Sequence, residues 1–146
     1  MPDLLLAILH HVLVFGLFGM LVLERALVSA PVIDTRRLAR IDAGVGLTSA
    51  LVLGVGVARV VWGGKGWSFY EANPFFWAKL ATFLLIGLLS ITPTLRFMRW
   101  AKSARDQPDF QPAFVEIKAT RIRLALMTLM FIPLLGFAAA MARWPF

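Results

Sequence analysis

Four long apolar runs, separated by polar and basic stretches, form the main pattern of this chain. They cover residues 4–23, 43–62, 75–95 and 124–142. A helix of about 20 apolar residues is long enough to cross the hydrocarbon core of a bilayer. The pattern therefore predicts an all-α fold, in which residues 1–146 form a single domain: a polytopic membrane protein with a bundle of four transmembrane helices.

The third run has the clearest helix signals and the most unusual charge. Asn73 is a good N-cap, and Pro74 suits the first helical position because its missing N–H is not needed there. The aromatic residues 75–77 are typical of a membrane–water interface. Lys79 lies one turn inside this apolar helix, where a charge is costly unless it reaches the interface or finds a partner.

Turn and cap residues define the other boundaries. The first run has no positively charged N-terminal region, so we interpret it as a retained helix that ends before Pro31, and not as a cleaved signal peptide. Asp34 predicts the start of the second helix. Residues 63–67 predict a tight turn, 106–112 a linker, and 113–123 a helical lead-in to the fourth run.

Composition agrees with a membrane location. Of the 146 residues, 60% are hydrophobic, and the mean hydropathy is +0.79. A soluble domain of this length has too little interior to bury so much apolar surface. The chain contains no cysteine, which excludes disulfides and thiolate metal sites.

The net charge of +7 arises mainly in two of the three connections between the runs. Such basicity can indicate nucleic-acid binding, but here its position along the chain indicates orientation. We expect the first and third connections to be cytoplasmic and both termini to be extracytoplasmic, in a bacterial inner membrane, with the lipid bilayer and no nucleic acid as partner. At the cytoplasmic boundary, Glu24, Arg25 and Asp42 are expected to pair. The basic residues are Arg25, Arg36, Arg37 and Arg40 in the first connection, and Arg96, Arg99, Lys102, Arg105, Lys118, Arg121 and Arg123 in the third.

The second run is rich in small residues. Small side chains let helices approach closely in lipid, where packing drives association. We therefore expect a homo-oligomer with at least one interface formed by such residues. They are Gly44, Gly46, Ser49, Ala50, Gly54, Gly56 and Ala58.

Ionisable residues from three of the runs are expected to meet in the outer half of the bundle. Such residues inside a membrane commonly mark a cofactor, ion or proton site. The two adjacent histidines point about 100° apart on a helix, so they cannot both ligate the same face of one cofactor. The alternative is that they are polar residues near the interface, satisfied by a carbonyl or by water; Glu71 is the candidate partner of the arginine. The four residues are His10, His11, Arg59 and Lys79.

Two stretches carry a resemblance to known families. His10 with Gly19, and the start of the third run at Trp77 and Lys79, resemble an uncharacterised bacterial family of four-helix inner-membrane proteins over nearly the whole chain. More distantly, they resemble HemJ-type protoporphyrinogen oxidases and CopD-type membrane proteins. In HemJ-like proteins a histidine of the first helix and a lysine of the third are the functional pair, and haem b is the suspected cofactor. The resemblance implies that His10 and Lys79 are catalytic here, with His11 as the alternative because the spacing to Gly19 is one residue shorter.

Three functions are compatible with these residues. The first is a HemJ-like, haem-associated oxidoreductase, in which His10 or His11 ligates haem b and Lys79 binds a propionate or an anionic tetrapyrrole, with a quinone as a candidate acceptor. The second is a non-enzymatic protein for haem or copper binding, transport or assembly. Copper would be held by the histidines and thioethers, since it favours such ligands. The third is a structural membrane protein whose histidines and lysine only reach the interface. The thioethers of the fourth run are those of Met127, Met130 and Met141.

The expected orientation is testable with reporter fusions. Alkaline phosphatase fused after Phe146 should be active, because it folds outside the cytoplasm, whereas a green fluorescent protein at the same position should be dark. The reverse pattern would contradict the positive-inside assignment.

Overall fold

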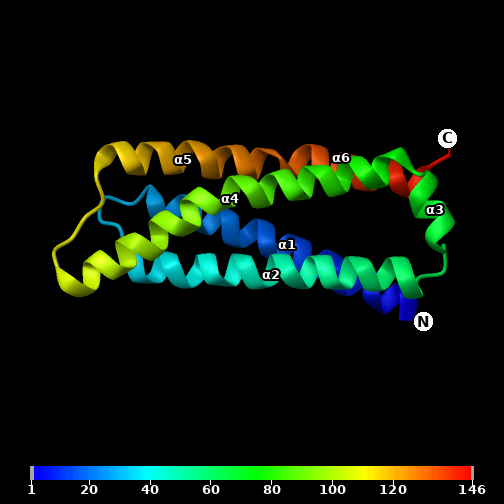
Figure 1. Ribbon diagram of the computed structural model, residues 1–146, viewed down its shortest axis with the longest axis horizontal. Helices are drawn as coiled ribbons and strands as arrows, with labels where there is room; N and C mark the ends of the chain where they lie inside the picture. Colours follow the sequence, from blue (N-terminus) through cyan, green and yellow to red (C-terminus); the bar gives the residue numbers. More distant parts are fainter. Residues whose placement is uncertain (1, 146) are drawn as a thin grey trace.

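The computed structural model describes residues 2–145, which form six helices and no strand (Figure 1). The last two helices follow each other end to end (Figure 1). Four segments are long and apolar enough to cross a membrane. The all-α arrangement of four such segments predicted from the sequence is therefore confirmed. The helices are α1 (Pro2–Val28), α2 (Thr35–Trp62), α3 (Trp67–Ala72), α4 (Pro74–Asp106), α5 (Phe114–Leu129) and α6 (Phe131–Arg143).

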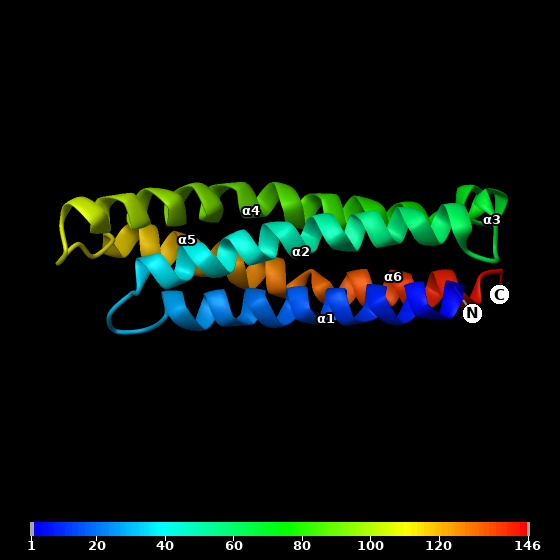
Figure 2. The same cartoon turned by 90° about the horizontal axis from the view of Figure 1, so that it is seen from below.

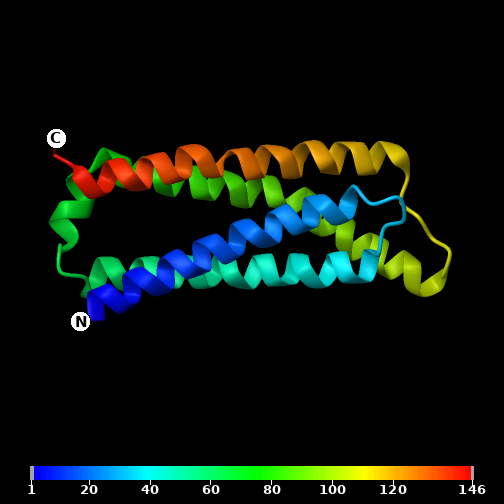
Figure 3. The same ribbon diagram turned by 180° about the vertical axis from the view of Figure 1, so that it is seen from behind.

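The long helices pack in a ring and reverse direction at each connection. α1 packs against α2, α2 against α4, α4 against α5 and α6, and α5 against α1. Both chain termini and α3 lie at one end of the bundle, which we call the terminal end (Figures 1 and 2). The two basic connections lie at the other end, which we call the basic end. α1 crosses the bundle diagonally, with its N-terminal part beside α2 (Figure 3).

Two predicted N-caps are present. The Asn73 side chain accepts a hydrogen bond from the Phe75 N–H at 3.0 Å, and Pro74 is the first residue of α4. Asp34 caps α2 by accepting a 2.9 Å bond from the Arg37 N–H. Both caps satisfy backbone donors that a helix leaves free at its start.

Two parts of the chain differ from the prediction. The turn at residues 63–67 leads into a short helix, α3, which the sequence did not indicate. The fourth run is not one helix, because α5 ends at Leu129 and α6 begins at Phe131. Pro133 accounts for this break, since proline has no N–H to donate to the carbonyl four residues before it.

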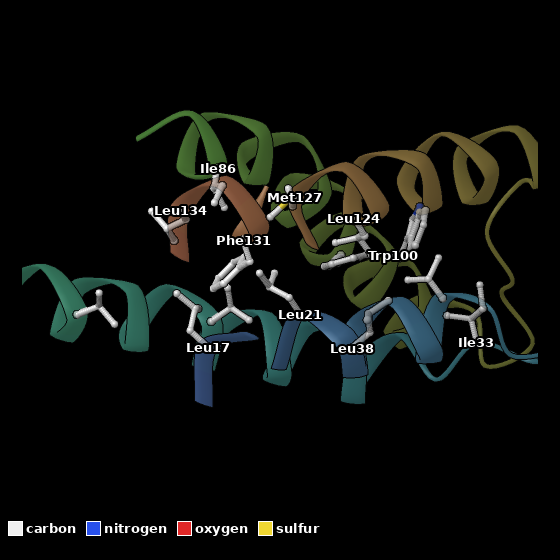
Figure 4. Packing of buried hydrophobic residues seen from close by; sticks show 14 residues of the cluster. Leu17, Leu21, Ile33, Leu38, Ile86, Trp100, Leu124, Met127, Phe131 and Leu134 are labelled. Atoms are coloured by element: carbon white, nitrogen blue, oxygen red, sulfur yellow. The ribbon is translucent and has the colours of Figure 1, made fainter. Parts of the chain in front are cut away.

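A narrow apolar core fills the centre of the bundle. Leu17 and Leu21 of α1 meet Met127 of α5 and Phe131 of α6, and Trp100 lies towards the basic end (Figure 4). Large apolar side chains are exposed along all the long helices, as expected for surfaces that face lipid. Examples are Leu5, Leu47, Leu84, Leu129 and Ile132.

Polar contacts link the helices at the basic end. Glu116 of α5 accepts a 2.9 Å bond from the indole N–H of Trp100 and pairs with Arg99. Arg96 donates to the Thr120 hydroxyl at 3.0 Å. These contacts join α4 to α5 in one register, and the basic residues of this end thereby stabilise the fold as well as carrying the orientation signal.

The small residues of α2 serve two different surfaces. Gly56 faces His10 of α1, so it belongs to a contact within the bundle. A Cβ added at Gly54 would meet no atom within 4 Å. Of these two glycines, only Gly54 therefore lies on a surface open to a second copy, and the homo-oligomer stays a prediction.

Asn73 offers a sharp test of the packing at the terminal end. It is fully buried, and its amide donates to the Met141 carbonyl at 3.2 Å while its oxygen caps α4. Asn73→Ala loses both bonds and should lower the free energy of unfolding by about 1–3 kcal/mol. Asn73→Asp keeps the capping oxygen but places a second acceptor against the Met141 carbonyl, so it should also be destabilising. Unfolding in mild detergent, followed by circular dichroism, measures both; a fully stable Asn73→Ala would contradict this role.

Candidate functional site

Three basic side chains from three helices meet near the terminal end. His10 lies on α1, Arg59 in the last turn of α2, and Lys79 in the second turn of α4. Arg59 and Lys79 both act electrostatically on His10, and Arg59 acts on Lys79. The structure thus brings together three of the four residues that the sequence singles out. We call them the basic cluster.

His10 faces the bundle and packs against Gly56. A Cβ atom at position 56 would lie 3.5 Å from the ring atom Cε1, which is an ordinary van der Waals contact. The ring also lies near the Val52 backbone. Nδ1 is buried and has no hydrogen-bond partner in the described structure. His10 therefore keeps its free nitrogen inside the contact between α1 and α2.

His11 points away from the bundle. Its side chain is exposed, and its ring centroid lies 6.2 Å from that of His10 at an interplanar angle of 85°. Nδ1 of His11 lies 2.6 Å from the Ala7 carbonyl one turn earlier. A ring held through Nδ1 presents Nε2 to its surroundings, which is the common arrangement of a metal-ligating histidine. The expected divergence of the two histidines is thus observed, and the bundle-facing one is His10.

Arg59 and Lys79 have no acidic partner. Within residues 2–145, the one ion pair joins Arg99 and Glu116 at the basic end. The Nε of Arg59 is buried and makes no hydrogen bond in this part of the chain. The Lys79 ammonium lies 5.9 Å from the centroid of the Phe76 ring, a distance at which the ring face attracts a cation. The proposed pairing of Arg59 with Glu71 is not formed, so the cluster carries an uncompensated positive charge.

Aromatic rings border the basic cluster. Tyr70 of α3 lies 5.4 Å from both Phe69 and Phe76, measured between ring centroids, and Phe76 lies 5.3 Å from Trp77. Tyr70 is buried, although it is not among the four site residues predicted from the sequence. The density of aromatic residues between positions 67 and 77 is the signal that could have indicated it.

The acidic residues of the first connection do not pair as expected. Glu24 and Asp42 are buried and face each other, whereas Arg25 is exposed to the surroundings of the bundle. Over the described residues, no three histidine, aspartate or glutamate side chains gather closely enough to hold a metal ion. The pairing of Glu24 and Asp42 with Arg25 was therefore a wrong prediction, and the two carboxyl groups form a pair of their own.

Residues 2–144 match the family described as "Predicted membrane protein (DUF2214)". No curated protein and no solved structure matches the chain. The family match agrees with the four apolar helices, and it supplies no ligand or activity. The likeness to HemJ-type and CopD-type proteins stays an expectation drawn from the sequence.

Proposed function

Because the chain belongs to the DUF2214 family of predicted membrane proteins, its basic cluster has to function within or beside a bilayer, and we propose that it binds an anionic tetrapyrrole there, with haem b as the first candidate. This proposal combines the charge of the cluster with the resemblance to HemJ-like proteins. It concerns the terminal end of the bundle, where His10, Arg59 and Lys79 converge.

The uncompensated charge is the observation that carries the proposal. Two cations without a counter-ion are costly in an apolar setting, and the cost falls when an anion binds them. Arg59 and Lys79 provide two such cations on neighbouring helices. Haem and related tetrapyrroles carry two or more carboxylates on an apolar ring. Their carboxylates would bind the two cations, and the ring would contact the apolar and aromatic surface around them.

The histidines fit the iron of a haem unequally. A haem iron commonly takes a histidine nitrogen as axial ligand. His11 has an exposed ring whose Nε2 is free, whereas the free Nδ1 of His10 is buried in the contact between α1 and α2. The geometry therefore favours His11 as the ligand, and His10 as the residue that positions α1 beside the two cations. When bound, haem would supply one-electron redox chemistry, and the residues of this chain would bind and orient it.

Of the three methionines in the fourth run, Met127 gives the copper alternative no support. Met127 is almost fully buried and lines the same small cavity as Leu17 and Leu21. It is therefore a core side chain, and packing accounts for its position.

The proposal predicts which substitutions weaken binding. Lys79→Met keeps the apolar stem and removes the charge, so it should weaken the binding of both protoporphyrin IX and haem by about tenfold to a hundredfold, the value of one charge-assisted contact. His11→Ala should alter the Soret band of bound haem but leave protoporphyrin binding unchanged. His10→Ala should have the smaller effect on the Soret band. Absorption and fluorescence titrations of the purified protein in detergent measure all of these.

Lys65→Met is the matched control. Lys65 lies at the same end of the bundle, is exposed and stacks at 4.3 Å over the Phe69 ring, outside the basic cluster. Its replacement should leave tetrapyrrole binding unchanged. Equal losses in Lys65→Met and Lys79→Met would indicate a general charge effect, and a wild-type protein that binds neither compound would overturn the proposal.

A further inference from the structure

Two buried carboxyl groups meet between α1, α2 and α4. Glu24 lies near the end of α1 and is 1% exposed, and Asp42 lies on α2 and is 7% exposed. Their carboxyl groups lie close enough to interact with each other. Thr94 of α4 donates a 2.9 Å bond to Oδ1 of Asp42. Three helices thus contribute one polar side chain each to a single point in the apolar core.

No cation compensates this pair in the described structure. Arg25, next to Glu24, is exposed. Arg96 of α4 donates to Thr120 and to the Glu116 carbonyl, and Arg121 of α5 donates to the Val28 carbonyl at 3.1 Å. Among the titratable groups of the described residues, Asp42 is the one that acts on Glu24.

A hydrogen bond between the two carboxyl groups requires a proton. An ionised carboxylate only accepts hydrogen bonds, so two of them can bond to each other only when one carries a hydrogen. Two neighbouring negative charges without a cation are also strongly unfavourable in an apolar core. Oε1 of Glu24 is buried and has no hydrogen-bond partner among the described residues. It is therefore a vacant acceptor inside the core.

A small cavity lies next to the pair, towards the terminal end. It has a volume of about 40 Å³, and its lining includes Leu21, Val45 and Ser90. These positions lie one helical turn from Glu24, Asp42 and Thr94, respectively, and all three lie on the terminal side because of the helix directions. A water molecule needs about 10–15 Å³ of such space and polar partners. The cavity is large enough, and the hydroxyls of Ser49 and Ser90 in its lining supply polar atoms.

We propose that Glu24 and Asp42 form an intramembrane proton site. In the loaded state, one carboxyl group carries the proton as O–H and donates a hydrogen bond to the other, while Thr94 orients Asp42. Release of the proton to water leaves two carboxylates, and uptake forms the O–H bond again. The cavity beside the pair gives water access to it. The proton site lies between the basic cluster, which is at the terminal end, and the basic end of the bundle. It does not depend on the tetrapyrrole proposal.

Infrared spectroscopy of the full chain in lipid nanodiscs tests this site. We expect a carbonyl-stretching band of a protonated carboxylic acid at neutral pH, which shifts in D₂O and disappears at high pH as the proton is released. Glu24→Gln and Asp42→Asn should each remove the band. Thr94→Val keeps both carboxyl groups and should shift the band, so the test stands even if an acid variant fails to fold.

Glu71→Gln and Asp109→Asn are the matched controls, because both acids are exposed and lie outside the pair. They should leave the band unchanged, and circular dichroism should show that all variants are helical. The proposal is overturned by a wild-type protein without the band at neutral pH, or by a band that persists in both acid variants. It is also overturned if the band disappears when sodium replaces choline as the cation of the buffer salt, because the pair would then bind a metal cation.

Discussion

In a bilayer, a polar side chain must find its partner within the protein or in a ligand, and the two ends of this bundle meet that requirement differently. At the basic end, Glu116 of α5 accepts from Trp100 and pairs with Arg99. At the terminal end, Arg59 and Lys79 form no ion pair with any acid of the described residues. The first arrangement stabilises the fold, and the second leaves a charge that a ligand can satisfy.

This contrast connects packing to function. The core is narrow, and its contacts from Leu17 to Trp100 hold the helices without filling a large interior (Figure 4). Each buried polar group is therefore close to lipid and has few neighbours to compensate it. His10 lies against Gly56 of α2, and that contact brings the imidazole beside the two cations. The same scarcity of partners leaves the carboxyl groups of Glu24 and Asp42 next to each other, without a cation among the described residues.

The sequence predicts what depends on local pattern. Four apolar segments and the caps at Asp34 and Asn73 follow from residue spacing and backbone chemistry, and all are observed. The helix α3 was missed because its six residues, which begin at the end of the predicted turn, are too few to show an apolar periodicity. The direction in which His10 faces and the pairing of Glu24 with Asp42 depend on how α1 is rotated against α2. That rotation is set by contacts between segments distant in the chain, which a single sequence does not display.

The central claim is that the basic cluster recognises carboxylates on an apolar ring. Its most direct measurement compares the affinity of the purified protein for haem and for haem dimethyl ester, in which the propionate charges are removed. Wild-type protein should bind haem about tenfold or more tightly than the ester, as expected for a charge-assisted contact. In Lys79→Met this preference should shrink or vanish. Equal affinities of the wild-type protein for the two compounds would contradict the claim, whatever the absolute affinity.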